Sequence, residues 1–277
     1  MANRIGVCSW SLQPESPTQL VERVSGLGLR RVQLALDPLR RAEWSTEETR
    51  VLFDKHGLEL ASGMMQTVGE DYSSLESIRR TGGLVPDEHW EANRNAATEN
   101  AKLARGLGIS LVSFHAGFLP EERGSTERTQ LIDRLREVVD RFEAEDVATA
   151  FETGQESAAN LAEVMEELDR PSAGVNFDPA NMILYDKGDP VEALDRLLPW
   201  VRQIHVKDAR RTLEPGTWGS EVPVGEGEVD WKAFFERVRA ANQDCDLIIE
   251  REAGTERERD IRAAIEVVRT HCEGVEL

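Results

Sequence analysis

The sequence contains little cysteine: Cys8, Cys245 and Cys272 are its three examples among 277 residues. Their spacing matches no zinc-binding motif, and an odd number cannot form a complete set of disulfides. Small buried thiols in a reducing compartment are therefore expected, which predicts a cytoplasmic protein.

Long apolar runs are also absent. No stretch of about 18 apolar residues could form a membrane span. Residues 1–4 lead directly into a strand-like segment, without the pattern of a signal peptide. We expect a soluble protein that has no membrane partner.

Positive charge is scarce relative to negative charge. The chain has 33 Lys and Arg against 52 Asp and Glu, which gives a formal net charge of −19. Nucleic-acid binding depends on Lys and Arg displacing counterions, so nucleic acid is not an expected partner. A local basic pocket could still hold a small anion, because the balance describes the whole surface.

The glycine pattern of a dinucleotide site is missing too. The first turn from strand to helix, residues 9–14, reads Ser-Trp-Ser-Leu-Gln-Pro and contains no glycine. A dinucleotide needs glycines there so that the backbone can approach its phosphates. We therefore expect no nucleotide cofactor.

The sequence does contain eight alternating strand and helix signals, roughly 30 to 40 residues apart. The predicted strands are 4–10, 31–36, 58–65, 110–115, 147–152, 174–178, 203–208 and 246–250. The predicted helices are 16–28, 45–56, 87–107, 125–144, 157–168, 190–197, 230–241 and 256–271. Eight such units close an α/β barrel of the (β/α)8 (TIM) type, and no linker divides residues 1–277, so a single domain is predicted. An open, doubly wound sheet is the alternative.

Two loops that follow predicted strands are longer than simple connections. They cover residues 66–86 and 209–229, and the second contains several glycines around Trp218. Such loops commonly form lids or binding segments on the catalytic face of a barrel.

Four successive predicted strands end in residues that an inert barrel would not favour: Glu152, Asp178, His205 and Glu250. The neighbours of opposite parity are apolar, so these four side chains should point inward at the carboxyl end of the barrel. Any one of them alone is more typical of an ion pair or a helix cap. Together, three carboxylates would repel one another unless a cation lies between them. The oxygen-rich set favours one divalent ion, Mn²⁺ or Mg²⁺, with Co²⁺ as a further option.

Five short motifs, in order, resemble the sugar phosphate isomerase/epimerase family, the xylose isomerase-like TIM barrels that include ketose 3-epimerases and inosose-processing enzymes. They are Phe151–Gly154, Asn176–Asn181, His205–Asp208, Gly225–Trp231 and Glu250–Arg251. The resemblance implies that Glu152, Asp178, His205 and Glu250 bind one metal ion. It also implies that Glu152 and Glu250 exchange the substrate's proton and that Arg211 meets substrate oxygens.

One residue departs from the pattern of the ketose 3-epimerases. They tend to have histidine three residues after the metal-binding Asp, where this chain has Asn181. Asn can hydrogen-bond a substrate hydroxyl but cannot titrate, so the substrate or the reaction can differ from theirs.

Four further residues are candidates for substrate binding. His115 has inward parity, with a buried, hydrogen-bonded histidine as the alternative. Lys207 shares a face with His205 and could neutralise an oxyanion, or else pair with Glu152 or Asp178. Trp10 and Trp218 could wall a sugar ring, or belong to the core.

The leading hypothesis is a divalent-metal-dependent isomerase or epimerase of a keto-sugar or related polyol ketone, with proton transfer through a metal-bound enediolate. The alternative is a lyase that uses the same site for β-elimination on 3-keto-glycosides. Phosphodiester hydrolysis on damaged DNA is opposed by the acidic balance, and a non-catalytic binding barrel by the two candidate bases. The expected partner is a small sugar, and a homo-oligomer is compatible with the sequence.

Overall fold

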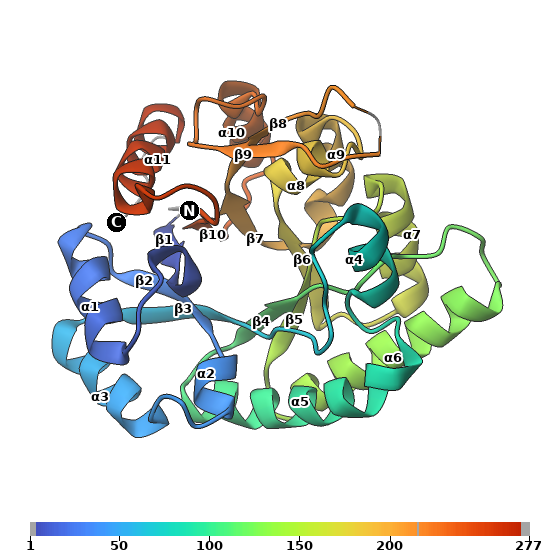
Figure 1. The fold of residues 1–277 in the computed structure, drawn as a ribbon, viewed down its shortest axis with the longest axis horizontal. Helices are drawn as coiled ribbons and strands as arrows, with labels where there is room; N and C mark the ends of the chain where they lie inside the picture. The colour runs from blue at the N-terminus through green and yellow to red at the C-terminus, as the bar shows by residue number, and fades with distance from the viewer. Residues whose placement is uncertain (1–3, 215, 273–277) are drawn as a thin grey trace.

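Eight parallel strands close into a barrel in this computed structural model, which describes residues 4–214 and 216–272. Around the barrel the order is β1-β10-β7-β6-β5-β4-β3-β2, and β2 pairs with β1 to close it (Figure 1). The barrel strands are β1 Arg4–Cys8, β2 Arg31–Ala35, β3 Glu59–Met64, β4 Leu111–Phe114, β5 Ala148–Glu152, β6 Ala173–Phe177, β7 Val201–Val206 and β10 Asp246–Ile249. The predicted TIM barrel is confirmed, and the open sheet is wrong because both of its edges are paired.

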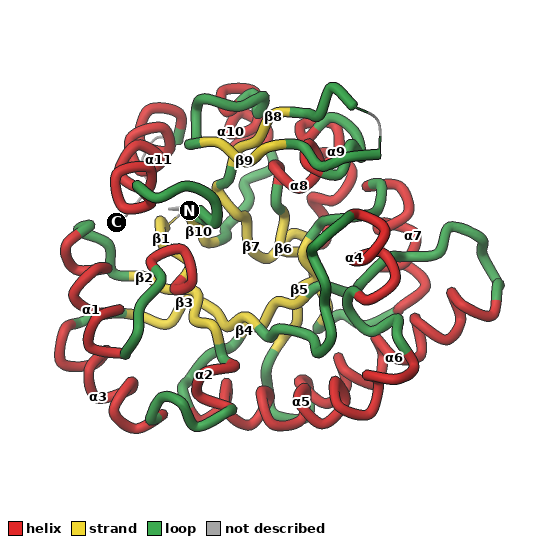
Figure 2. Tube along the Cα trace, in the orientation of Figure 1, coloured by secondary structure: helices red, strands yellow, loops and turns green. Residues whose placement is uncertain are grey.

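Helices surround the barrel, as the tube in Figure 2 shows. They are α1 Pro17–Gly26, α2 Asp37–Arg40, α3 Thr46–His56, α4 Leu75–Thr81, α5 Asp87–Gly106, α6 Thr126–Glu143, α7 Ala158–Leu168, α8 Pro179–Leu184, α9 Pro190–Leu197, α10 Trp231–Ala240 and α11 Arg257–His271. The predicted helix starts at Ser45, Ser125 and Ser157 are real N-caps, because each serine hydroxyl accepts a backbone N–H three residues on. The short helices α2, α4 and α8 were not predicted.

Two segments at the mouth of the barrel differ from the prediction. The first strand ends at Cys8, and a 3₁₀ turn over Ser9–Leu12 follows it, so Trp10 is not a strand residue. The long loop 209–229 contains an antiparallel hairpin, in which β8 Asp208–Arg210 pairs with β9 Ser220–Val222. Both segments lie at the carboxyl ends of the strands.

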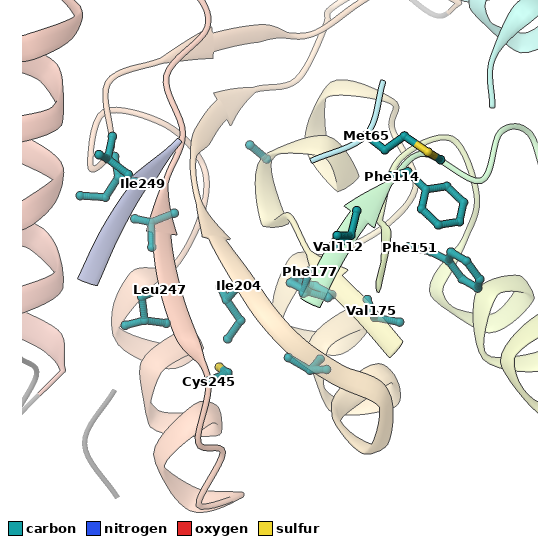
Figure 3. Close-up of a cluster of buried hydrophobic side chains, with 14 of the residues drawn as sticks. Met65, Val112, Phe114, Phe151, Val175, Phe177, Ile204, Cys245, Leu247 and Ile249 are labelled. Carbon is teal, nitrogen blue, oxygen red and sulfur yellow. The ribbon is translucent and has the colours of Figure 1, made fainter. Parts of the chain in front are cut away.

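The hydrophobic core lies between the barrel wall and the helices. Phe114, Phe151, Val175, Phe177 and Leu247 are all 1% exposed or less, and Figure 3 shows them in one apolar cluster. Burying side chains of this size contributes about 1.5–3 kcal/mol each. This layer holds the strands, and therefore their polar carboxyl ends, in fixed positions.

The barrel interior, in contrast, is polar. Gln33 Nε2 donates to Ser113 Oγ at 2.7 Å, and Ser62 Oγ donates to Gln203 Oε1 at 2.5 Å. These pairs join strands that are not neighbours, so the hydrogen bonds cross the interior. Ser113 and Gln203 lie two residues before His115 and His205, so this layer is one step below the mouth. It forms a hydrogen-bonded floor under the residues at the strand ends.

Among the described residues, none of the helices combines the length and the apolar character needed to cross a membrane.

Candidate metal centre and active-site cavity

The four residues at the strand ends meet at the mouth of the barrel. Glu152, Asp178, His205 and Glu250 each offer a ligand atom, and these atoms all lie within 4.8 Å of one another. All four side chains are buried, at 5% exposure or less. Three carboxylates and an imidazole in so small a volume form a group that could hold one metal ion.

Two buried atoms in this group fit an ion better than any protein partner. Asp178 Oδ2 and His205 Nδ1 have no hydrogen-bond partner among the described residues. His205 Nδ1 lies 3.5 Å from Glu152 Oε1, 3.6 Å from Asp178 Oδ2 and 3.5 Å from Glu250 Oε2. Buried polar atoms without a partner cost about 1–3 kcal/mol each. The donor set therefore fits a divalent cation that satisfies both atoms at once.

The charges in the group are strongly perturbed. Burial alone would raise the pKa of Glu250, but Lys207 and His205 outweigh it and lower that pKa well below its ordinary value. Burial alone would lower the pKa of His205, but Glu152 and Glu250 raise it well above its ordinary value. Without an ion, a proton on His205 thus offsets the carboxylates, which is the charge that a metal would supply.

Lys207 lies beside this group at the mouth of the barrel and hydrogen-bonds two carboxylates. Its Nζ donates to Glu250 Oε2 at 2.8 Å and to Glu252 Oε2 at 2.7 Å, whereas Asp178 Oδ2 is 3.9 Å away. The predicted ion pair with Asp178 is thus present, but it is the longest of the three, and the nearer partners are Glu250 and Glu252. The lysine lies where it can fix Glu250 and still face a bound molecule.

Cys8 lies beside the site and forms a second group with His205 and Glu250 whose ligand atoms lie within 4.8 Å of one another. Its Sγ is 3.8 Å from His205 Nε2 and 3.4 Å from Gln33 Oε1. Burial raises the pKa of the Cys8 thiol far above its ordinary value, so without an ion the thiol keeps its proton.

A cavity of about 320 Å³ opens above the group. Its walls come from seven of the loops and strand ends at the mouth: Trp10, Met64, Tyr72, His115, Glu152, Asn181, Leu184, Tyr185, Lys207, Trp218, Glu221, Glu250 and Glu252. A volume of this size is typical of a small-molecule site. The structure thus brings five of the six predicted substrate-binding residues to one cavity, together with both predicted proton-transfer glutamates.

Besides Lys207, two of these residues hydrogen-bond the candidate ligands. Trp10 Nε1 donates to Glu250 Oε1 at 2.8 Å. Asn181 Nδ2 donates to Glu152 Oε1 at 3.2 Å and to the Thr153 carbonyl at 2.9 Å. Both side chains therefore orient a carboxylate as well as lining the cavity.

Of the three remaining predicted residues, His115 and Trp218 line the cavity and Arg211 does not. His115 is part-exposed, and its Nε2 lies 4.0 Å from Glu152 Oε1. Trp218 packs edge-on against Tyr185, with ring centroids 4.8 Å apart. Arg211 is not brought to the cavity, because its guanidinium contacts Glu228 Oε2 at 3.0 Å and the Gly188 carbonyl at 2.9 Å.

Sequence reasoning missed several residues of the cavity wall. Glu252 has the same parity as Glu250 and could have been found from it, whereas Tyr72 and Tyr185 lie in or beside loops without periodicity. Tyr72 packs edge-on against His115 at 6.5 Å, from the loop that precedes α4. For such loop residues, the unusual length of the loop is the only sign in the sequence that they belong to a site.

Asp208 explains the glycine-rich motif at Gly225–Trp231. Its Oδ2 accepts the backbone N–H of Gly225 at 2.9 Å and of Gly227 at 3.2 Å, as well as Trp231 Nε1 at 3.0 Å. A side chain at position 227 would place its Cβ 2.0 Å from Asp208 Oδ1, so only glycine fits. The Asp208 carboxylate is therefore a buried anchor for the loop.

Residues 21–271 match the family model described as Xylose isomerase-like TIM barrel, and the chain belongs to this family. A solved xylose isomerase domain protein from Planctomyces limnophilus is similar over 98% of both chains, with a TM-score of 0.88 and 29% identity.

Two curated relatives match over part of their length. YihM from Escherichia coli (strain K12) is 27% identical over 174 residues, which cover 58% of this chain and 49% of that protein. The 3-dehydroshikimate dehydratase of Bacillus anthracis is 25% identical over 130 residues, which cover 41% of this chain and 46% of that enzyme. The matched stretches thus span about half of each relative.

More distant solved structures share the fold alone. The 3-keto-D-glucoside 4-epimerase YcjR from E. coli has a TM-score of 0.73 and 15% identity, over 97% of this chain and 99% of that one. A xylose isomerase-like TIM barrel protein from Mycobacterium smegmatis, in complex with magnesium, has a TM-score of 0.72 and 16% identity, over 98% and 99%.

Proposed function

We propose that this chain is a divalent-metal-dependent isomerase or epimerase of a keto-sugar or related polyol ketone. The observation that carries the proposal is the pair Glu152 and Glu250, which line one cavity from β5 and from the end of β10. Asp178 and His205, on the strands between them, complete the candidate ligand set. Two carboxylates that flank one site from different strands can take a proton from carbon and return it on another face.

Glu152, Asp178, His205 and Glu250 would hold the ion, and Mg²⁺ or Mn²⁺ suits this oxygen-rich set. The magnesium complex of the M. smegmatis structure is consistent with this choice. When bound, the ion would polarise the substrate's carbonyl and neighbouring hydroxyl oxygens and so make the proton between them easier to remove.

The residues around the two glutamates set their states and positions. Lys207 and Trp10 hydrogen-bond opposite oxygens of Glu250, which fixes that carboxylate. Lys207 and His205 lower its pKa and so keep it ionised. Asn181 holds Glu152 Oε1 from the other side of the site. A base held in one orientation loses little freedom when the proton moves. Trp218 and Tyr185 pack edge-on against each other and form an aromatic part of the cavity wall.

A second candidate is a lyase, in which removal of the same proton expels a substituent from the next carbon. Two observations favour it: Asn181 stands where the ketose 3-epimerases tend to have histidine, and one curated relative is a dehydratase. Both reactions begin with the same proton abstraction, so they differ only in the fate of the resulting carbanion. Deuterium in the recovered sugar indicates isomerisation or epimerisation, and a released leaving group indicates elimination.

The test is proton exchange in deuterated water with Mg²⁺ or Mn²⁺ present. A panel of keto-sugars and 3-keto-glycosides would be followed by NMR for deuterium at carbon and for new products. We expect exchange with the wild type and a loss of about 10²–10⁴-fold in Glu152→Gln and Glu250→Gln, the range that a general base contributes. The matched control is Glu166→Gln, an exposed position on α7, which should retain the wild-type rate. Wild-type rates in both active-site variants would overturn the proton-transfer roles.

A further inference from the structure

The cavity above the candidate metal centre continues into a second space. A neighbouring cavity of about 350 Å³ extends toward α2 and has five wall residues in common with the first: Trp10, Met64, Tyr72, His115 and Glu252. Because the two spaces have these walls in common, they are lobes of one cleft. The inner lobe lies over the ligand group, and the outer lobe lies over the ends of β2 and β3.

The outer lobe has side chains of its own. Ala35, Asp37, Pro38, Arg41, Gln66 and Glu70 line it and do not line the inner lobe. Asp37 is fixed from two sides, since its Oδ1 accepts Arg40 at 2.6 Å and its Oδ2 accepts the backbone N–H of Gln66 at 2.8 Å. The Gln66 side chain is exposed and free to meet a ligand. Helix α2 and the start of the loop 66–86 therefore form a built wall.

The chemistry of this wall fits a neutral sugar ring. Trp10, Tyr72 and Pro38 offer flat apolar surfaces, which suit the C–H face of a sugar, and Gln66 offers an amide at the edge. Asp37 has both carboxylate oxygens engaged within the protein. A phosphate is disfavoured, because Asp37, Glu70 and Glu252 outnumber Arg41, the one Arg or Lys among the described lining residues.

We propose that the outer lobe is a subsite for a second, neutral sugar ring, so that the substrate is a keto-glycoside and not a free monosaccharide. The inference rests on the proposed function in one respect, that the keto ring occupies the inner lobe beside Glu152 and Glu250. The glycosidic bond then lies beside the walls that the two lobes have in common, which include Trp10 and Tyr72. Tyr72 is 46% exposed, so part of this common wall faces solvent.

The test is equilibrium binding of sugars that cannot react. Methyl glucoside and methyl maltoside contain no carbonyl, so the Mg²⁺-loaded protein binds them without turnover, and calorimetry or ligand-observed NMR gives both affinities. We expect methyl maltoside to bind at least about tenfold tighter, which is about 1.4 kcal/mol. Equal affinities would overturn the subsite.

Two variants place the preference in the outer lobe. Ala35→Phe should fill the lobe and remove the preference for methyl maltoside, with methyl glucoside and Mg²⁺ bound as before. Gln66→Ala, at an exposed position, should reduce the preference severalfold and keeps the test valid if Ala35→Phe does not fold. A preference that survives both changes would overturn the assignment.

A charged probe tests whether the outer lobe binds an anion in place of a neutral sugar ring. If glucose 6-phosphate binds more tightly than methyl maltoside and Arg41→Ala removes that advantage, the lobe is an anion site and the proposal is wrong. The proposed function fails separately: a disaccharide preference without deuterium exchange on any keto-sugar or keto-glycoside would leave the subsite standing and remove the isomerase assignment. Deuterium exchange without a preference for the disaccharide would leave the isomerase assignment standing and remove the subsite.

Discussion

The two ring nitrogens of His205 face different chemical environments. Nδ1 faces the three carboxylates, whereas Nε2 lies 2.7 Å from Gln33 Oε1 and 2.9 Å from Asn176 Nδ2. Of these two neighbours, only Gln33 Oε1 can accept a hydrogen bond from Nε2. The nitrogen of the same Gln33 amide donates to Ser113 Oγ, which fixes the orientation of the amide. A proton held on Nε2 by Gln33 leaves the Nδ1 lone pair free for a metal ion.

Replacing Gln33 should therefore weaken metal binding without removing a ligand. We expect Gln33→Leu to lower the affinity for Mn²⁺ by about 10–100-fold, the usual cost of losing the group that orients a ligating histidine. Titration calorimetry measures this directly, and Gln33→Glu, which keeps an acceptor at this position, serves as the comparison. Equal Mn²⁺ affinities in the wild type and Gln33→Leu would show that another group sets the tautomer.

At this scale the sequence predicted the candidate ligands but not their supports. Glu152, Asp178, His205 and Glu250 could be found because strand parity and the carboxyl ends of parallel strands define one location. Gln33 was not singled out, because its partner His205 is 172 positions away and no local pattern links the two. Arg211 was placed by resemblance alone, and its contacts with Glu228 and Gly188 hold it outside the cavity wall.

At the scale of elements, the β8–β9 hairpin carries Trp218 and Glu221 to the cavity, and Asp208 fixes its base. Local signals predicted most helices well, because serine caps and glycine ends are encoded within a few residues. The hairpin was not predicted, because its strands are three residues each and the long connection shows no alternation. The strand β7 begins at Val201, two residues before the prediction, since pairing with β6 extends it.

The close approach of Gly227 to Asp208 predicts a sensitive position in this element. Gly227→Ala would bring a methyl group into the Asp208 carboxylate and the Ala209 carbonyl, which would lie 2.0 Å and 2.6 Å from its Cβ. We expect a loss of about 2–3 kcal/mol in the free energy of unfolding, measured by urea titration, because several hydrogen bonds to a buried charge are disturbed. Glu226→Ala, an exposed neighbour in the same loop, should change it by less than about 0.5 kcal/mol. Similar values for the two variants would contradict the anchoring role of Asp208.

At the scale of the whole molecule, the candidate metal centre joins four strands that are consecutive around the barrel, β5, β6, β7 and β10. An ion that binds only the folded barrel stabilises it by about 2.7 kcal/mol at a free concentration of one hundred times Kd. We expect saturating Mn²⁺ to raise the melting temperature by a few degrees, and a chelator to reverse the rise. Asp178→Asn should respond much less in the same thermal scan. A melting temperature unaffected by Mn²⁺ would argue against a metal at these residues.

Glu156 gives the stability of the molecule a distinct pH dependence. Its side chain is buried, and its Oε1 accepts the Gly154 N–H at 3.2 Å. Burial raises the pKa of Glu156 to about 7, although the Gly154 N–H, His115 and Lys187 act in the opposite direction. The carboxyl is therefore held as an acid at pH values where an exposed glutamate is ionised.

Proton linkage determines the sign of this dependence. Below about pH 4.3 both the folded and the unfolded chain carry the proton, so the raised pKa of Glu156 has no cost. As the pH rises from there to about 7 the unfolded chain ionises first and folding becomes less favourable, and above about 7 the cost is constant.

Glu156→Gln removes this cost. The free energy of unfolding of the variant minus that of the wild type should therefore grow between pH 5 and pH 8, by an amount on the order of 2–3 kcal/mol. Urea titrations at the two pH values, with a chelator present in both, measure the difference, and Glu166→Gln on the exposed face of α7 should show no such growth. A difference that stays constant between the two pH values would mean that Glu156 is already ionised in the folded chain at pH 5.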